Sequence, residues 1–448
     1  MRERWHRPLL ASAVVALVVM GAAPASASHN ADTHSANMTH LANVPRVGTA
    51  TQSDLAFQGN FAYAGAFNGF RIIDISNPPS PSQVTFFPCN GGQGDVSVWG
   101  DLLFSSVDTP QSSPSCNSTN VANAAVPGAW EGVRIFDISD PAALEHIASV
   151  ATDCGSHTHT LVPRGKGSLF IYVSSYALTA PSVGPNCEQF HGKISVIHVP
   201  MGNPADAEVV AEPEVDIPDF DASRVELDDL VPPGFLLDTN GCHDISVLTP
   251  LKIAAAACLS VGQIWDIEDP TAPIPLRTFD IPEVAAWHSA AFTWDGERVA
   301  FGDEAGGGNL PRCRPEDAST RGAVTVFDVD SGTKLGHYKI PRFETGICTM
   351  HNFNFVPGID RDILVSSAYT GGTTVADLTN PASPVELGFY KVAGPPASNA
   401  WSSYWHNGFV YANDIVRGFD VFSVAHPALA GAATLDRDNP QTQTQLFG

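Results

Sequence analysis

The stretch GFRIIDISNP at residues 69–78 decides the fold, because its pattern returns along the chain. It recurs as GVRIFDISDP at residues 132–141 and as GQIWDIEDP at residues 262–270. Weaker or degenerate copies of the same pattern lie at residues 192–204, 322–330, 372–381 and 418–427. Seven copies of one short unit indicate a repeat architecture.

Each copy has the pattern of one alternating strand that ends in a turn at Asp-Pro or Asn-Pro. Two short apolar segments precede the copy, and a further strand follows the proline, as in PVELGFY at residues 384–390. Four strands per unit, at a spacing of about 40 to 60 residues, are typical of a β-propeller. The sequence therefore predicts an all-β fold, a single seven-bladed β-propeller of four-stranded blades over residues 39–427. We expect an N-terminal strand at residues 39–47 to complete the seventh blade and close the ring.

An aspartate stands just before the turn in five copies: Asp74, Asp137, Asp266, Asp328 and Asp377. A carboxylate at this point accepts hydrogen bonds from the backbone N–H groups of the turn. We therefore assign these aspartates a structural role.

The N-terminus has the pattern of an export signal. Three arginines in the first seven residues precede an apolar run at residues 8–23, and Ala-Ser-Ala at residues 25–27 matches a cleavage site. We expect residues 1–27 to be a secretory signal peptide, residues 28–38 a flexible mature N-terminus and residues 428–448 a polar tail. No other apolar stretch is long enough to span a bilayer. The prediction is a secreted, extracellular protein, free or associated with the cell surface.

The charge balance excludes one class of partner. The chain of 448 residues has 47 Asp and Glu against 23 Lys and Arg, a net charge of −24 with no basic run. Binding to nucleic acid or to an anionic membrane surface depends on basic side chains that neutralise phosphate. We expect no nucleic acid, and instead an unknown protein, glycan or small-molecule ligand.

The G-x-R-I-x-D-I-S-x-P units resemble LVIVD repeats, a family of exported bacterial β-propellers. The resemblance extends over about residues 40–427 and implies an extracellular or cell-surface protein. The third and seventh copies depart from the pattern, with His198 and Ser423 near the usual aspartate. These departures affect the boundaries of the two copies and not the fold.

All eight cysteines lie beyond the predicted signal peptide, and an even number in an exported chain favours disulfides. In blades 2 to 4, one cysteine lies just before the first strand and another at or after the end of the second strand. These two points are adjacent in a blade. The predicted pairs are Cys89–Cys116, Cys154–Cys187, Cys242–Cys258 and Cys313–Cys348.

All four predicted disulfides fall on one face of the propeller, which we call the top face; there the first strand of each blade begins. Long loops fall on the same face, at residues 108–131, 177–191, 217–241 and 304–321. Insertions on one face of a repeat protein commonly mark its binding face. We therefore place the ligand on the top face.

Histidines recur at the start of the first strand. His243, His288 and His351 fall at the same register in blades 4, 5 and 6, and His157 and His159 lie within one residue of that register in blade 3. Equivalent positions on successive blades converge toward the axis, so these imidazoles could meet one ion. Neutral imidazole suits Zn, Cu, Fe and Ni.

Two aspartates near the start of the first strand, Asp95 and Asp244, could supply a further ligand or orient a histidine. The candidate metal ligands are His157, His159, His243, His288, His351, Asp95 and Asp244. The predicted cofactor is a transition metal ion, Cu, Fe or Zn. Two other interpretations of the histidines stay open: hydrogen bonding between strands, and a ligand pocket without metal.

The sequence leaves three functions open. The first is an extracellular binding or interaction protein with a His/Asp metal site at the top of the central channel. The second is a metal-dependent extracellular oxidoreductase, an oxidase or oxygenase. The third is a structural surface module. No nucleophile, phosphate-loop or zinc-protease motif is present, and the acids available as a general base are Asp95, Asp244, Asp303 and Glu304.

Overall fold

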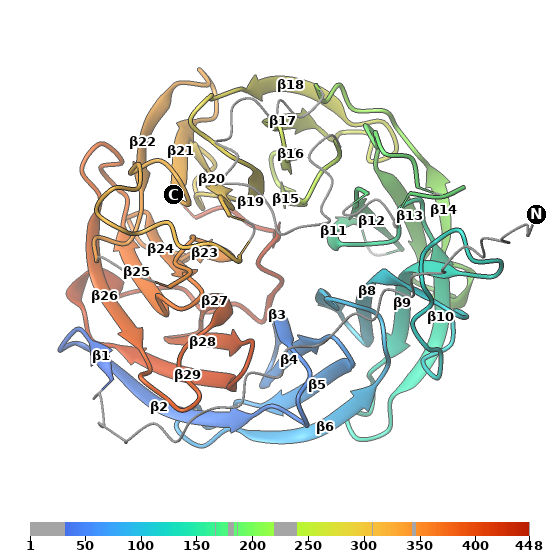
Figure 1. Cartoon of the computed structure of the whole chain (residues 1–448), viewed down its shortest axis with the longest axis horizontal. Helices are drawn as coiled ribbons and strands as arrows, with labels where there is room; N and C mark the ends of the chain where they lie inside the picture. Colours follow the sequence, from blue (N-terminus) through green and yellow to red (C-terminus); the bar gives the residue numbers. More distant parts are fainter. Residues whose placement is uncertain are drawn as a thin grey trace, which may run out of the picture. The chain divides into compact units, whose positions relative to one another are not determined.

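Seven antiparallel sheets stand around a central channel (Figure 1). We describe the protein from a computed structural model, in which residues 32–448 form one unit. The structure describes these residues except 166, 178–182, 186, 219–239, 307, 343–345 and 448. The predicted signal peptide lies outside the described residues. The predicted seven-bladed all-β propeller is confirmed.

Blades 1 to 4 follow one another along the chain, and the first strand of each is the one nearest the channel. Their strands are β3 (Gln52–Gln58), β4 (Phe61–Ala66), β5 (Gly69–Asp74) and β6 (Ser82–Pro88); β7 (Val96–Trp99), β8 (Leu102–Gln111), β9 (Trp130–Asp137) and β10 (Glu145–Ala151); β11 (Thr158–Arg164), β12 (Ser168–Ser174), β13 (Ser195–Pro200) and β14 (Glu208–Ala211); β15 (Asp244–Leu248), β16 (Ile253–Cys258), β17 (Val261–Asp266) and β18 (Ile274–Phe279).

Blades 5 to 7 continue the ring. Their strands are β19 (Trp287–Phe292), β20 (Arg298–Asp303), β21 (Val324–Asp328) and β22 (Lys334–Tyr338); β23 (Phe353–Phe355), β24 (Ile363–Ser367), β25 (Thr373–Asp377) and β26 (Val385–Lys391); β27 (Ala400–His406), β28 (Phe409–Asp414) and β29 (Gly418–Val424). Buried apolar side chains from adjacent blades form the core between the sheets, with Trp265, Trp287 and Phe104 among the largest.

The N-terminal strand closes the ring. Strand β2 (Met38–Pro45) pairs antiparallel with β29 as the fourth strand of blade 7. Arg71, from the first repeat copy, donates hydrogen bonds to the carbonyls of Val44 and Pro45 at 3.3 and 3.1 Å. This buried arginine therefore ties the closing strand to blade 1. Ahead of β2, β1 (Thr33–His34) pairs with β26 in blade 6.

The repeat motif has a local physical basis. The carboxylate of Asp74 accepts a hydrogen bond from the backbone N–H of Ser76 at 2.8 Å, and the four equivalent aspartates accept corresponding bonds at 2.7–2.9 Å. This geometry fits the structural role predicted for these aspartates. The opening glycine is also required, because Gly69 has a φ of +138° and a Cβ there would lie 2.0 Å from the carbonyl oxygen of Phe87.

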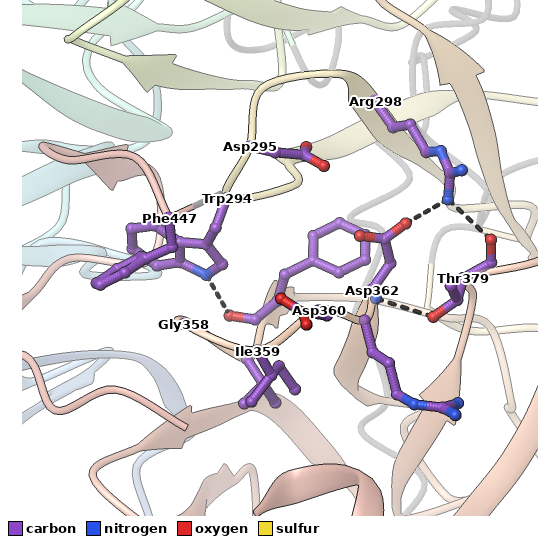
Figure 2. Close-up of a pocket in the computed structure, with 12 residues that line it drawn as sticks. Trp294, Asp295, Arg298, Gly358, Ile359, Asp360, Asp362, Thr379 and Phe447 are labelled. Carbon is purple, nitrogen blue, oxygen red and sulfur yellow. Dashed lines mark hydrogen bonds and ion pairs between the residues drawn. The ribbon is translucent and has the colours of Figure 1, made fainter. Parts of the chain in front are cut away.

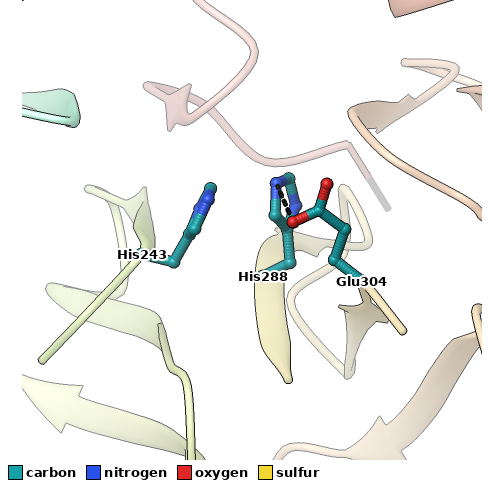
Figure 3. A group of neighbouring side chains, drawn as sticks. All are labelled: His243, His288 and Glu304. Carbon is teal, nitrogen blue, oxygen red and sulfur yellow. Dashed lines mark ion pairs between the residues drawn. The ribbon is translucent and has the colours of Figure 1, made fainter. Parts of the chain in front are cut away.

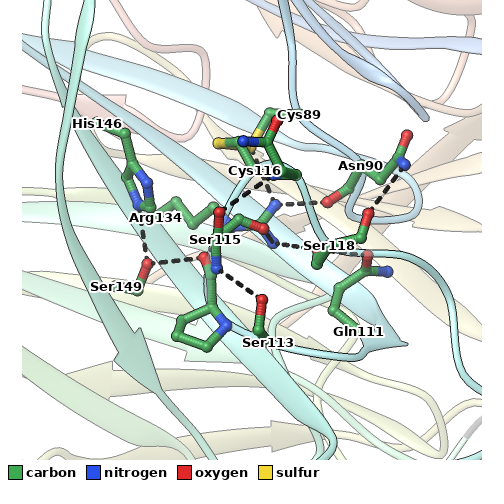
Figure 4. The surroundings of a disulfide bond; sticks show 12 residues. Cys89, Asn90, Gln111, Ser113, Ser115, Cys116, Ser118, Arg134, His146 and Ser149 are labelled. Atoms are coloured by element: carbon green, nitrogen blue, oxygen red, sulfur yellow. Dashed lines mark hydrogen bonds between the residues drawn. A yellow bond between two sulfur atoms is a disulfide. The ribbon is translucent and has the colours of Figure 1, made fainter.

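All four predicted disulfides are present: Cys89–Cys116, Cys154–Cys187, Cys242–Cys258 and Cys313–Cys348. Figure 4 shows the first of them beside Arg134, the arginine of the second repeat copy. The buried Arg134 guanidinium donates to the carbonyls of Asn90, Pro114 and Ser115 at 2.5, 2.9 and 3.3 Å. Burial lowers the pKa of Arg134 to about 10. The disulfide and this arginine together hold the long loop of blade 2 against the sheet.

The C-terminal segment crosses the middle of the ring (Figure 1). Strand β30 (Arg437–Asp438) pairs with β3, and β31 (Thr442–Gln443) pairs in parallel with β15 on its channel side. The side chain of Asn439 both donates to and accepts from the backbone of Val98 at 2.9 and 2.8 Å. Gln443 donates to the carbonyl of Phe292. Residues 428–448, which we predicted only as a polar tail, thus contribute a buried crosspiece.

The end of this crosspiece reaches a surface hollow of about 320 Å³ between the turns of blades 5 and 6 (Figure 2). The ring of Phe447 packs edge-on against Trp294, and the Phe447 N–H donates to the Trp294 carbonyl at 2.9 Å. The Trp294 indole N–H in turn donates to the carbonyl of Phe355 at 2.8 Å. No helix in the described part of the chain is long and apolar enough to cross a membrane.

Candidate metal centre

Four histidines from four consecutive blades meet in the channel near the top face. His157 and His243 directly precede β11 and β15, His288 lies in β19, and His351 precedes β23 by two residues. Successive ring centroids in this order lie 4.3, 3.8 and 4.3 Å apart. All four side chains are buried. The structure thus brings together His157, His243, His288 and His351 of the predicted set; we call them the axial histidines.

The Glu304 carboxylate, directly after β20, faces two of the axial histidines. Glu304 places Oε2 at 3.7 Å from the Nε2 atom of His288 and Oε1 at 3.7 Å from the Nε2 atom of His351. Ligand atoms of His243, His288 and Glu304 all lie within 4.8 Å of one another (Figure 3). The sequence placed Glu304 among the available acids, but gave no reason to make it a ligand. The only feature of the sequence that marks Glu304 is its position directly after the second strand of blade 5.

The outer nitrogens of two axial histidines are held by hydrogen bonds. His157 directs Nδ1 to the Asp108 carboxylate at 2.9 Å, and its Nε2 lies 2.8 Å from the Nε2 of His243. The Nδ1–H of His351 donates to the carbonyl of Trp401 at 2.5 Å. Metal-binding histidines commonly donate their second N–H in this way, which fixes the ring and the tautomer.

His288 differs from its neighbours, because neither of its ring nitrogens makes a hydrogen bond in the part of the chain that the structure describes. Its side chain is only 3% exposed. A buried polar group without a partner costs about 1–3 kcal/mol. The nitrogens of His288 therefore indicate that an additional partner belongs in this cluster.

Burial sets the protonation state of the cluster. Loss of water lowers the pKa of His351 to about 3 and holds the pKa values of His243 and His288 well below their usual range, and neighbouring histidines add to the effect. The axial histidines 243, 288 and 351 are therefore neutral at pH 7 and offer lone pairs. Burial raises the pKa of Glu304 to about 7, while a hydrogen bond from the Tyr369 hydroxyl at 2.6 Å opposes that rise.

Carboxylates also line the channel beneath the axial histidines. Asp54, Asp95 and Asp244, all buried, border with the axial histidines a cavity of about 20 Å³, space for roughly one water molecule or ion. Burial raises the pKa of Asp54 to about 7 and that of Asp244 well above its usual range, and the other aspartates add to both shifts. Gln441, from the C-terminal crosspiece, lines the same cavity and donates to Asp54 at 3.1 Å.

The two predicted aspartates occupy this lower layer. Oδ2 of Asp95 accepts the backbone N–H of His159 at 2.8 Å, and Oδ1 is buried without a partner among the described residues. Oδ1 of Asp244 accepts the N–H of Ile245 and the hydroxyl of Thr158 at 2.8 and 3.3 Å. They line the cavity but do not join the group formed by His243, His288 and Glu304.

His159 lies apart from the axial histidines. Its Nε2 is 2.6 Å from the hydroxyl of Ser97, and its Nδ1 is 2.8 Å from the hydroxyl of Ser106 and 3.1 Å from Asp95. With both nitrogens engaged between blades 2 and 3, His159 has the environment of a core histidine. Of the two histidines in blade 3, the structure places only His157 at the axis.

Comparison with known sequences points to the same architecture. A sequence model of the LVIVD repeat matches residues 50–87, which correspond to blade 1. This match and the seven blades fit the architecture of an LVIVD-repeat β-propeller. A search of curated proteins finds no match.

Solved structures resemble this propeller at low sequence identity. Hydrazine synthase of Kuenenia stuttgartiensis matches with a TM-score of 0.53 and 11% identity, over 83% of this chain and 94% of that chain. The computationally designed protein Ika8 matches with a TM-score of 0.48 and 12% identity, over 86% of this chain and 99% of that chain. At 11% identity, the likeness to hydrazine synthase shows the fold alone.

The LVIVD unit that is matched contains none of the axial histidines. The matched repeat therefore accounts for the strands of blade 1, while the axial histidines lie at or just before the start of the first strands of blades 3 to 6. Such a propeller suits a binding scaffold, and its four disulfides fit an oxidising compartment.

Proposed function

We propose that this protein is an exported binding scaffold that holds a transition metal ion among the axial histidines. His243, His288, His351 and Glu304 are the ligands, with His157 as a further ligand or as the group that orients His243. The carrying observation is His288, a buried histidine with no hydrogen-bond partner in the described structure. An ion would supply the partner that its nitrogen lacks.

The donor set restricts the kind of ion. Imidazole nitrogens with one carboxylate suit Zn, Cu, Fe or Ni better than Ca²⁺ or Mg²⁺, which take oxygen ligands. Thiolates are excluded as ligands, because all eight cysteines are disulfide-bonded. The neutral state of the buried histidines favours binding, since a ligand nitrogen must be unprotonated.

The top face is where this scaffold would meet its partner. The predicted signal peptide and the four disulfides support export. The long loops of blades 2 and 5 border the axial histidines through Asp108 and Glu304. A partner that binds these loops would therefore sense whether the metal site is filled.

Titration of metal-free protein with Zn²⁺ and Cu²⁺ tests the metal site. We expect about one equivalent to bind to the wild type, and His288→Ala to weaken binding by at least about 100-fold. His198→Ala is the matched control, because His198 lies in β13, away from the channel, and bonds to Ser168. Equal binding by wild type and His288→Ala would refute the site.

A second function, a metal-dependent oxidoreductase, is favoured by the 20 Å³ cavity against the axial histidines. A ligand position open to one small molecule is what a catalytic metal needs. The chain's own groups there are the Glu304 carboxylate, which can take or give a proton near pH 7, and the Tyr369 hydroxyl bonded to it. Reduction and reoxidation of the copper-loaded protein, followed by its absorption spectrum, distinguishes this function from metal storage or structure.

A further inference from the structure

A second pocket lies on the outer rim of the propeller, between β22 of blade 5 and β26 of blade 6. Its volume is about 350 Å³, within the range of small-ligand sites. Seven of its lining residues are charged or titratable: Arg314, Asp317, His337, Tyr338, Lys339, Arg342 and Glu386. We call this site the rim pocket.

Both carboxylates of the rim pocket are already satisfied. Asp317 accepts hydrogen bonds from the Arg314 guanidinium at 2.8 and 3.2 Å. Glu386 forms an ion pair with Arg342 and accepts the hydroxyl of Thr374 at 2.8 Å. Each acid therefore already has an arginine partner, and the charge of Asp317 also acts on Lys339 without forming an ion pair with it.

Lys339 is the cation that remains. Its ammonium group donates to the carbonyl of Ala318 at 3.1 Å, and within the described residues no carboxylate lies at ion-pair distance from it. Burial lowers the pKa of Lys339 to about 8. The charges of Asp317 and Asp303 oppose that shift only in part, so a half-buried ammonium with no carboxylate at ion-pair distance gains from an anion placed beside it.

The remaining walls of the rim pocket are apolar and stiff. Pro315, Pro341, Pro384 and Ile340 line it, and Cys313 ties one wall to Cys348 through a disulfide. Proline rings and a disulfide leave little freedom to lose when a ligand binds. The ligand that fits these walls carries an apolar body next to its anionic group.

His337 adds a second polar group on the same strand end. Its Nε2 lies 3.2 Å from the hydroxyl of Ser319, which also lines the pocket. A hydroxyl paired with an imidazole can turn its hydrogen toward a ligand oxygen. A carboxylate, with two acceptor oxygens, can use both the ammonium and this hydroxyl.

We propose that the rim pocket binds an organic carboxylate, with Lys339 as its counter-ion. The source is either a small organic acid or the C-terminal carboxylate of a peptide, since both present the same group on an apolar body. The proposal is independent of the axial metal site, because the two sites share no residue.

The test uses three probes on the full mature protein at low ionic strength: benzoate, N-acetyl-leucine and neutral N-acetyl-leucinamide. Binding is followed by saturation-transfer NMR and calorimetry. We expect at least one of the two acids to bind and the amide not to bind. Binding of N-acetyl-leucine alone identifies a peptide terminus, and binding of benzoate alone identifies a small acid.

Variants tie the binding to Lys339. Lys339→Gln should weaken the binding of the acid by about tenfold or more. Lys339→Arg should keep most of the affinity for the acid. Lys252→Gln is the matched control, because Lys252 already pairs with Glu268 on blade 4. The proposal is wrong if neither acid binds, if the amide binds as well as the acids, or if folded Lys339→Gln keeps wild-type affinity.

Discussion

The Nε2 atom of His351 lies 3.7 Å from Oε1 of Glu304. The other nitrogen of the ring donates to the carbonyl of Trp401, which can only accept, so Nε2 presents a lone pair to the carboxylate. Two acceptors that face each other need a proton or a cation between them. The raised pKa of Glu304, about 7, shows that burial favours a proton there. A metal ion would take the place of that proton.

Replacing Glu304 separates the ligand role from a structural one. In Glu304→Gln the amide can donate to a histidine nitrogen, so we expect the metal-free protein to be at least as stable as the wild type. Metal affinity should fall by about 100-fold or more. Thermal unfolding and Zn²⁺ titration measure the two effects.

The matched control for this variant is Glu316→Gln, an exposed acid in the long loop of blade 5. It should change neither quantity. Loss of stability in Glu304→Gln, with metal affinity unchanged, would show that Glu304 serves the fold and not an ion.

The C-terminal crosspiece should contribute measurably to stability. Asn439→Ala removes both hydrogen bonds to the buried backbone of Val98, and we expect the free energy of unfolding to fall by about 1–3 kcal/mol. Gln445→Ala, at an exposed position of the same segment, should have almost no effect. Chemical denaturation of the three proteins provides the comparison, and equal midpoints would show that the crosspiece is dispensable.

One disulfide should couple stability to the metal site. Cys242 directly precedes His243, so Cys242→Ser with Cys258→Ser should lower the free energy of unfolding by about 2–4 kcal/mol and weaken metal binding. Removal of Cys89–Cys116 by the same exchange to serine should lower stability and leave metal binding unchanged. Figure 4 shows that this disulfide lies next to Arg134 and not next to an axial histidine. Metal affinity that is insensitive to both double variants would contradict the coupling.

The pH dependence of stability should carry a contribution from Glu131. Burial, with the nearby charge of Asp108, raises its pKa to about 8 in the folded protein, against 4.5 for the ordinary group. Between these values the folded state binds the extra proton, so stability falls as pH rises from about 4.5 to 8. Glu131→Gln removes this term, and denaturation at pH 5, 7 and 9 should show a smaller loss than in the wild type. If the free energy of unfolding falls with pH equally in both proteins, the Glu131 carboxyl is exposed to water and the expectation is wrong.

The repeat pattern predicted the ring, its closure and the disulfides because each depends on local spacing. In each blade the start of the first strand lies next to the end of the second strand. Cysteines at these two points could therefore be paired from the sequence. The same register predicted the positions of His243, His288 and His351. It could not choose between His157 and His159, because strand alternation gives positions two residues apart the same face, and only the start of β11 at Thr158 separates them.

Glu304 and Gln441 could not be predicted, for different physical reasons. Glu304 follows a strand as many acids do, and only the path of the blade 5 loop directs its carboxylate to His288. Gln441 lies between two strands of two residues each, too short to give any periodic signal. Its place in the channel depends on a hydrogen bond to Asp54 and on the cavity beside the axial histidines, contacts that exist only once the ring has formed.

Elemental analysis of the mature protein, exported by its host and purified without chelators or a histidine tag, tests the metal site most directly. The account predicts about one equivalent of Cu, Fe or Zn, lost in the triple variant His243→Ala, His288→Ala and His351→Ala. Protein with its fold and all disulfides intact but no transition metal would contradict it, and would leave the axial histidines as part of the scaffold.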